Sequence, residues 1–348
     1  MSSTTPPRPI DVTAIFPQLA PMARTATRLH PRPGAPSPHD SSVGGPLLWP
    51  ADEPWPYCDG PHEWDGLNEV LSPADIRLQR EIRAAVAARR AGGTHPPHHT
   101  PEERALEERI SAGQPWPEGP VAMLPVAQLF ARDVPLLKAP GNADADLLQV
   151  LWCPFDHPDH PRTALYWRSS ATISDSLAVQ PAPPALQFPG YLPEPCLLTP
   201  EEVTEYPNPL ELSKDDQQQL KDPTRWRQAG SGWDDAYGVA ADEFYRNLLS
   251  TAPGWKAGGW TRWGLTDPMP RRCSTCGTDM DPLLTIASRE WNSSTTSWIP
   301  LEDQADAISS PASAQPSHPT LLDLARGYDL QLHMCPASPE HPHLELIQ

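Results

Sequence analysis

The sequence predicts an α+β fold: mostly antiparallel β-sheets in two pseudo-repeated halves, with a helical hairpin inserted into the first half. Two observations predict the repeated sheets. Short apolar or alternating segments recur in both halves, and a glycine–tryptophan–proline motif occurs twice. A polar stretch near residues 66–118, bounded by helix start and stop signals, predicts the insertion. The 48 prolines among 348 residues favour short strands and extended connections over long helices.

The repeated motif reads G-G-x-x-x-W-x-x-x-x-P-x-P and is followed by a cysteine. It begins at Gly44 and again at Gly258, and its tryptophans are Trp49 and Trp263. The fixed spacing indicates one turn structure built twice, with glycines at positions of positive φ or close backbone approach.

A second pair of segments occurs in the same order. Each is an apolar strand that runs into Cys-Pro, then an acidic turn, then His-Pro. The first copy contains Cys153 and ends near His160, and the second contains Cys335 and ends near His341. Two matches in the same order predict an internal duplication of one β unit.

Strand patterns are found in six segments: residues 123–131, 146–154, 163–170, 281–288, 328–336 and 343–347. Helices are expected at residues 74–90, 102–110, 201–206, 214–220 and 240–249, and a loop at 303–319. We expect residues 1–40 to form a loosely ordered arm and residues 41–348 to form the domain. Its first half is 41–200, with the insertion at about 66–118, and its second half is 201–348.

The composition excludes several classes of function. A formal charge of -18 argues against binding nucleic acid or an anionic membrane. Solubility alone accounts for the charge, which leaves open a basic protein as partner. No targeting segment or membrane span is visible, so a cytoplasmic location is expected. In a reducing compartment, clustered Cys and His more often bind metal than form disulfides.

The second half carries the stronger metal-site signal. A two-residue gap in Cys273-Ser-Thr-Cys276-Gly lets both thiolates face one tetrahedral ion. The predicted zinc ligands are Cys273, Cys276, Cys335 and His341. His333 and His343 are rivals for the fourth place. A redox role for the cysteine pair is disfavoured because no helix is expected to begin there.

The analogous first-half ligands are Cys58 and His62, then Cys153 with either His157 or His160. The predicted set takes His160 as the fourth ligand. The alternative is that Cys58 and Cys153 are buried small residues without metal. Four protein ligands leave no open position, which predicts structural rather than catalytic zinc.

The chain resembles the bacterial YwqG-like family, a domain of unknown function. The resemblance is carried by the motif at Gly44, strands LPVAQLF and DLLQVLWCP, the stretch Gly254–Gly259, the Cys273–Cys276 knuckle and the strand into Cys335-Pro336. It implies an internally repeated, β-rich α+β fold without an established activity. It also suggests interaction roles, including that of immunity proteins that neutralise toxins.

Two functions remain open. The favoured one is an uncharacterised zinc-stabilised binding module, an immunity or inhibitory protein acting on a protein partner. The alternative is an enzyme or small-ligand binder with a site in the cleft between the halves. We find no phosphate loop, dinucleotide fingerprint or hydrolase motif, so no catalytic residues are assigned and a non-enzymatic role is favoured.

Overall fold

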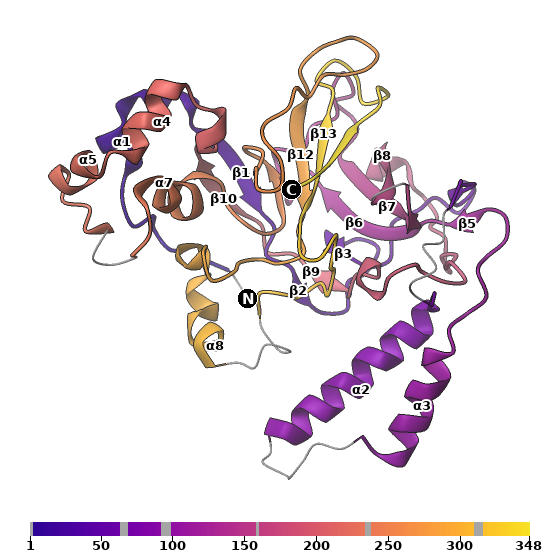
Figure 1. Ribbon diagram of the computed structural model, residues 1–348. Coiled ribbons are helices and arrows are strands. Elements are labelled where there is room, and N and C mark those ends of the chain that lie inside the picture. The colour runs from indigo at the N-terminus through magenta and orange to yellow at the C-terminus, as the bar shows by residue number, and fades with distance from the viewer. Residues whose placement is uncertain (1–2, 63–68, 92–98, 158–159, 234–237, 310–315) are drawn as a thin grey trace.

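Two six-stranded antiparallel sheets and a two-stranded ribbon form the body of the protein in the part of the chain that the structure describes (Figure 1). The structure is a computed structural model and describes residues 3–62, 69–91, 99–157, 160–233, 238–309 and 316–348. The predicted α+β class with mostly antiparallel sheets is confirmed.

Each half of the sequence supplies most of one large sheet. The N-half sheet has the order β2 (Arg32–Pro33), β9 (Cys196–Leu197), β3 (Ser42–Val43), β6 (Leu124–Phe130), β7 (Leu147–Asp156) and β8 (Pro161–Arg168). The C-half sheet has the order β10 (Glu201–Glu205), β1 (Arg24–Arg28), β11 (Lys256–Gly258), β12 (Asp281–Ile286), β13 (Leu330–Met334) and β14 (Leu344–Ile347). The ribbon pairs β4 (Tyr57–Cys58) with β5 (Val121–Ala122). All six predicted strand segments are confirmed.

The helices are short, except for two that form the inserted hairpin. They are α1 (Val12–Ile15), α2 (Pro73–Ala91), α3 (Pro101–Ser111), α4 (Lys214–Lys221), α5 (Pro223–Gln228), α7 (Ala241–Phe244), which continues as a π-helix over Tyr245–Ser250, and α8 (Gln304–Ser309). The helix predicted at 201–206 is wrong, because this segment is strand β10, paired with β1 along its whole length. The loop predicted at 303–319 begins instead as α8, and its residues 310–315 lie outside the described residues.

Residues 3–40 correct the expectation of a loosely ordered arm. Strand β1 lies in the interior of the C-half sheet, between β10 and β11. Phe16 and Leu19 are fully buried against the helical cluster that includes Trp226 and Phe244. The polar segment Arg24–Arg28 gave no apolar signal, yet its backbone pairs on both sides.

The helical hairpin projects away from the side of the body where α1, α4, α5 and α7 gather (Figure 1). Its start signals act as predicted: the Ser72 hydroxyl accepts a hydrogen bond from the Asp75 N–H at 3.1 Å. Thr100 and Glu103 form a capping box at α3. Arg80 fixes the hairpin base, because its guanidinium donates to the Leu192 carbonyl at 2.7 Å and contacts Glu194 at 3.1 Å.

One apolar core joins the two sheets. It includes Val126 and Val150 of the N-half sheet together with Leu284 and Leu332 of the C-half sheet, all nearly inaccessible to solvent. The two halves therefore share a hydrophobic interior and do not form separate globules.

The two sheets also show local parallels. β3-β6-β7-β8 and β11-β12-β13-β14 have the same order and the same antiparallel pairing. The ladder shifts register just after Pro125 in β6 and just after Pro282 in β12. Gly44 and Gly258, the first glycines of the two motif copies, both have positive φ, 63° and 67°. A duplicated module predicts such parallels, and the duplication itself stays a prediction.

Candidate metal centres

Four side chains meet at the end of the C-half sheet and form what we call the C-half cluster: Cys273, Cys276, Cys335 and His341. The Cys276 and Cys335 sulfurs lie 3.5 Å apart. Nδ1 of His341 lies 3.3 Å from the Cys335 sulfur and 3.5 Å from the Cys273 sulfur. All four ligand atoms lie within 4.8 Å of one another.

A tight turn sets the two thiols of the knuckle on one side of the backbone. The Gly277 N–H donates to the Cys273 carbonyl at 2.8 Å, and the Cys273 N–H donates to the Thr278 carbonyl at 2.9 Å. Gly277 has φ of 72°, a conformation that side chains with a Cβ rarely adopt. The sequence Cys-x-x-Cys-Gly therefore folds into a tight turn that places both thiols on the same side of the backbone.

The connection between β13 and β14 supplies the other two residues of the cluster. Cys335 directly follows β13, and His341 comes from the turn that leads into β14. The two rival histidines are engaged elsewhere. Nε2 of His333 lies 2.9 Å from the Thr261 hydroxyl, and Nε2 of His343 lies 2.7 Å from the Thr163 hydroxyl.

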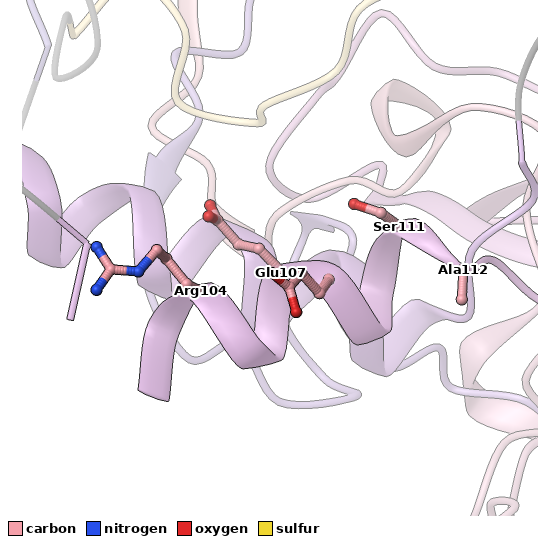
Figure 2. A pocket seen from close by; sticks show the side chains of 5 residues that line it. Arg104, Glu107, Ser111 and Ala112 are labelled. Carbon is pink, nitrogen blue, oxygen red and sulfur yellow. The ribbon is translucent and has the colours of Figure 1, made fainter. Parts of the chain in front are cut away.

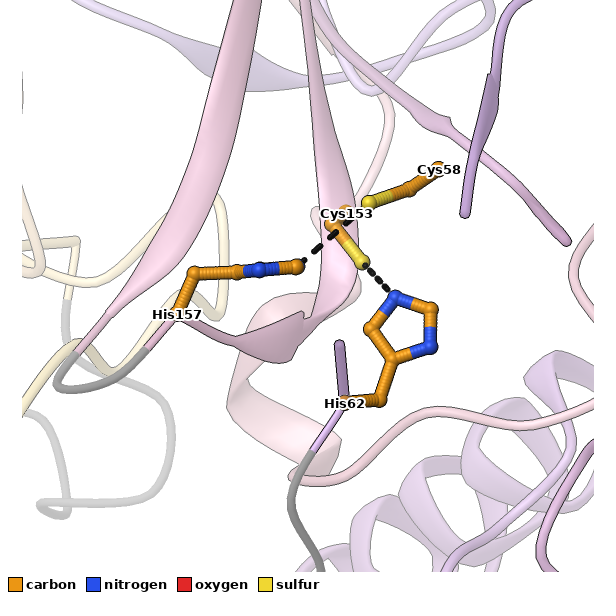
Figure 3. Close-up of side chains that lie close together, drawn as sticks. All are labelled: Cys58, His62, Cys153 and His157. Atoms are coloured by element: carbon orange, nitrogen blue, oxygen red, sulfur yellow. Dashed lines mark hydrogen bonds between the residues drawn. The ribbon is translucent and has the colours of Figure 1, made fainter. Parts of the chain in front are cut away.

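The first half brings together a second set, which we call the N-half cluster: Cys58, His62, Cys153 and His157. Figure 3 shows the four side chains pointing toward one another. The Cys58 sulfur lies 3.4 Å from Nε2 of His157, and the Cys153 sulfur lies 3.2 Å from Nε2 of His62. Here too all four ligand atoms lie within 4.8 Å of one another.

The assignment of His160 to this cluster is corrected. His157 takes the fourth place, whereas Nδ1 of His160 lies 3.1 Å from the Pro161 carbonyl and 3.7 Å from a Glu345 oxygen. The reason is the turn between β7 and β8, in which the His157 N–H donates to the His160 carbonyl at 2.8 Å. This turn leaves His157 beside Cys153 and directs His160 toward β14.

Electrostatics differ between the clusters. Burial raises the pKa of the Cys153 thiol, and burial lowers the pKa of His157 to about 4 and also lowers the pKa of His62. Burial likewise raises the pKa of the Cys335 thiol. In contrast, hydrogen bonds with Thr278 lower the pKa of the exposed Cys276 thiol to about 6. Imidazoles that stay neutral at pH 7 are ready to bind a metal, and a nearby cation favours deprotonation of the buried thiols.

The donor sets suit zinc. Tetrahedral zinc with metal–ligand bonds of about 2.0–2.3 Å requires donor atoms roughly 3.5–3.8 Å apart. The measured sulfur–sulfur and sulfur–nitrogen separations of 3.2–3.5 Å are close to that. Thiolate and imidazole are also the ligands that zinc prefers in closed structural sites. Both clusters could therefore hold a metal ion.

Sequence reasoning did not find the contacts that support the ligands. Thr278 lies 3.3 Å from the Cys276 sulfur through its hydroxyl. The Phe155 ring packs against both His62 and Trp116, with ring centroids 5.1 and 4.8 Å away. Phe155 lies between Cys153 and His157 in the sequence. This position between two predicted ligands was the signal from which its packing against the cluster could have been predicted.

A pocket of about 520 Å³ lies elsewhere, on the inserted hairpin. Figure 2 shows that it is lined by one stretch of α3 and the residue after it, including Arg104, Glu107, Ser111 and Ala112. A hollow along one helix offers no convergence of groups from different elements, so the Cys/His clusters remain the better candidate sites.

Comparison with known proteins gives no function for these clusters, so their role is inferred from their own chemistry. No model of a known protein family matches the chain, and no curated protein matches it. Among the helices of the described ranges, none combines the length and apolar character that crossing a membrane requires.

Proposed function

We propose that this chain is a protein-binding module whose two Cys/His clusters hold structural zinc, and that it acts on a basic partner as an inhibitory or immunity protein. The observation that carries the proposal is the completeness of both ligand sets. Four protein donors converge in each cluster, which leaves no ligand position for water or substrate. Closed zinc sites stabilise loops and do not activate water.

The zinc part of the proposal has a direct chemical consequence. When zinc is bound, it supplies the charge that keeps the thiols deprotonated and joins the knuckle to the end of β13. In the N-half cluster, Cys58 and His62 would be joined in the same way to Cys153 and His157 at the end of β7. Each ion would then fix a cysteine-bearing loop to the end of a strand, β7 in the first half and β13 in the second.

The binding part is supported by charge. A net charge of -18 favours association with a basic protein and speeds the encounter at low salt. The resemblance to the YwqG-like family points to the same interaction role and remains an expectation.

The test has two measurements. Elemental analysis of the purified chain should find about two zinc ions, one for each closed site. The zinc-loaded chain, used as bait in cells that naturally make it, should capture a basic protein. The complex, rebuilt from purified components, should weaken with rising salt. A chain without metal, or a reconstituted complex insensitive to salt, would contradict the proposal.

A second candidate function rests on one pocket between the halves. It has a volume of about 260 Å³ and is lined by residues 136–138 and 140 of the first half and by parts of β11, β12 and β13. Only Lys138 and Asp281 carry charge among its lining residues, so it suits a small apolar ligand better than a reaction needing several polar groups. A thermal-shift screen with small apolar and sugar-like ligands tests it, and stabilisation lost in Leu137→Asp would favour this function.

A further inference from the structure

The N-terminal segment Ser3–Arg8 lies on the body of the protein in the manner of a bound peptide. Its backbone is held on both sides. The Leu301 N–H donates to the Thr4 carbonyl at 2.9 Å, and the Thr4 N–H donates to a Glu302 carboxylate oxygen at 2.9 Å. The Thr5 N–H donates to Glu201 at 2.9 Å. Backbone hydrogen bonds of this kind hold extended peptides in recognition sites.

The Thr5 side chain is recognised by two opposite charges. Its hydroxyl donates to Glu201 at 2.5 Å and accepts from Nη1 of Arg28 at 2.8 Å. Arg28 is fully buried, and its Nε and Nη2 have no hydrogen-bond partner within the described residues. A hydroxyl held between a carboxylate and a buried guanidinium is a specific contact, because an apolar group there would deprive each charged group of one of its hydrogen bonds.

The Arg8 side chain is recognised by an aromatic ring and by carbonyl groups. Its guanidinium lies 3.5 Å from the ring centroid of Trp298, within the range of a strong cation–π contact. It also donates to the Ser297 carbonyl at 2.9 Å and to the Leu248 carbonyl at 3.2 Å. Pro6 and Pro7 lie between the two recognised side chains and favour an extended backbone at low entropic cost.

The surface under this segment is held together by other contacts. β10 pairs with β1 from Arg24↔Glu205 to Arg28↔Glu201, so Glu201 and Arg28 lie opposite each other on neighbouring strands. Nε1 of Trp298 donates to the Asn247 carbonyl at 3.0 Å. A surface held by contacts that do not involve its occupant binds a peptide with less loss of entropy.

The charges of the surface suit a basic peptide. Glu201 and Glu302 face the segment, and the adjacent Asp303 binds Arg32 at 2.5 Å. Burial opposes ionisation of Glu201, but hydrogen bonds from His30 and Thr5 outweigh it and lower the pKa of Glu201 to about 2. The Glu201 carboxylate is therefore ionised at physiological pH and ready to accept donors.

We propose that the surface formed by Arg28, Glu201, Trp298 and Glu302, here called the strap site, recognises an extended Thr-Pro-Pro-Arg peptide presented by a basic partner protein. In the isolated chain, residues 3–8 occupy the strap site, and the partner's segment displaces them. The inference rests on the proposed function in that it takes the partner to be a basic protein, and it adds which segment of that partner is bound.

The experiment uses a chain that begins at Pro9 and a fluorescein-labelled peptide with the sequence of residues 2–8, followed by fluorescence anisotropy. The shortened chain should bind the peptide saturably. The full chain should bind it at least about tenfold more weakly, because a tethered segment competes at millimolar effective concentration. A peptide with Arg8→Ala should bind about tenfold more weakly than the unchanged peptide, as loss of a desolvated cation–π contact predicts.

Two controls keep the inference open to refutation. A peptide with the Thr-Pro-Pro-Arg core in unrelated flanks should still bind, and loss of its binding would contradict recognition of the core. If the shortened chain does not fold, full-length Arg8→Ala replaces it, and this variant should bind the unchanged peptide more tightly than the wild-type chain does.

Three outcomes would overturn the inference. One is a shortened chain with native circular dichroism that binds no peptide up to millimolar concentration. Another is equal binding of the Arg8→Ala peptide. The third is a full-length dimer in size-exclusion chromatography that dissociates on removal of residues 1–8, which would assign the site to a second copy. The assay involves neither metal nor partner, so failure of the proposed function would be seen separately.

Discussion

The two Cys/His clusters follow one plan in different surroundings. The N-half cluster lies against a buried aromatic core that includes Trp49, Trp55 and Phe155. The C-half cluster has little behind it: its buried apolar neighbour is Met280, with Leu344 partly buried beside it. In the first case packing already holds the loops, and in the second the metal would do much of the work of a core.

The ligands differ in a matching way. The N-half cluster offers two thiols and two imidazoles through Nε2, whereas the C-half cluster offers three thiols and one imidazole through Nδ1. Cys276 is exposed, while the other cysteines of both clusters are buried. The comparison teaches that, with metal bound, the same kind of cluster would supplement a core in the first half and replace one in the second.

Removal of both metals should give the largest effect. We expect a strong chelator to remove about 4 kcal/mol of stabilisation per ion, and so about 8 kcal/mol for both, when zinc is present at a thousandfold excess over its Kd. That corresponds to a fall in Tm on the order of 10 °C for a chain of this size. Differential scanning calorimetry with and without chelator measures it. An unchanged Tm would show that neither cluster depends on metal.

Single cysteine variants should separate the two clusters. Cys335→Ser and Cys153→Ser should each lose one zinc equivalent, because three remaining donors no longer close a tetrahedral site. In Cys335→Ser, the exposed loop 264–279 should lose most of its hydrogen-exchange protection, since few buried contacts hold it. In Cys153→Ser, residues 55–60 should lose a smaller part of their hydrogen-exchange protection than loop 264–279 loses in Cys335→Ser.

The matched control is Cys196→Ser. Cys196 is buried in the main core, and its thiol donates to the Pro319 carbonyl at 3.4 Å. This variant should keep both zinc ions and the protection of both loops. Equal loss of protection in Cys335→Ser and Cys153→Ser would break the comparison between the clusters.

Two histidine variants test the corrected ligand. His157→Asn should weaken zinc binding at the N-half cluster by 100-fold or more, beyond the roughly 10–100-fold typical of residues that only support a ligand. His160→Asn should change it little, because His160 faces Glu345. Competition with a chromophoric chelator measures both. The reverse order of effects would restore His160 as the ligand.

The smallest expected effect is a coupling between the clusters across the seam of β8 and β14. Glu345 accepts a hydrogen bond from the Thr163 N–H at 2.6 Å and lies 3.5 Å from His343 and 3.7 Å from His160. These contacts connect the turn after His157 with the turn after His341. Glu345→Gln should reduce the cooperativity of zinc loading between the two clusters by about 1 kcal/mol or less. A double-mutant cycle with Cys58→Ser measures this, as the effect of Cys58→Ser on zinc affinity at the C-half cluster with and without Glu345→Gln. An equal effect of Cys58→Ser in the chain with Glu345 and in the Glu345→Gln chain would contradict a connection through Glu345.

The sequence predicted the elements that have their own local signal. The six strand segments alternate or run apolar, and the inserted helices carry their own caps, so local chemistry was sufficient. The C-half cluster was found for the same reason, because Cys273-x-x-Cys276-Gly folds as one turn. Thr278 and Met280, which support it, carry no such signature.

The sequence could not predict features that depend on distant partners. The acidic segment Glu201–Glu205 suggested a helix, but pairing with β1 overrides that preference. Segment Arg24–Arg28 lacks apolar alternation, and its residues 26–28 are buried through pairing with strands far along the chain. The choice between His157 and His160 depended on the turn between β7 and β8, and both histidines precede a proline.

The position of β1 has a consequence for how the chain can be made and divided. This strand lies at residues 24–28, whereas both its neighbours, β10 and β11, come after residue 200. On the ribosome it must wait, unpaired, until those segments are synthesised, and contacts so distant in sequence slow folding. A fragment consisting of residues 201–348 alone would lack an interior strand, so separate expression of the halves should give insoluble second-half fragments that become soluble only when residues 1–200 are supplied together with them.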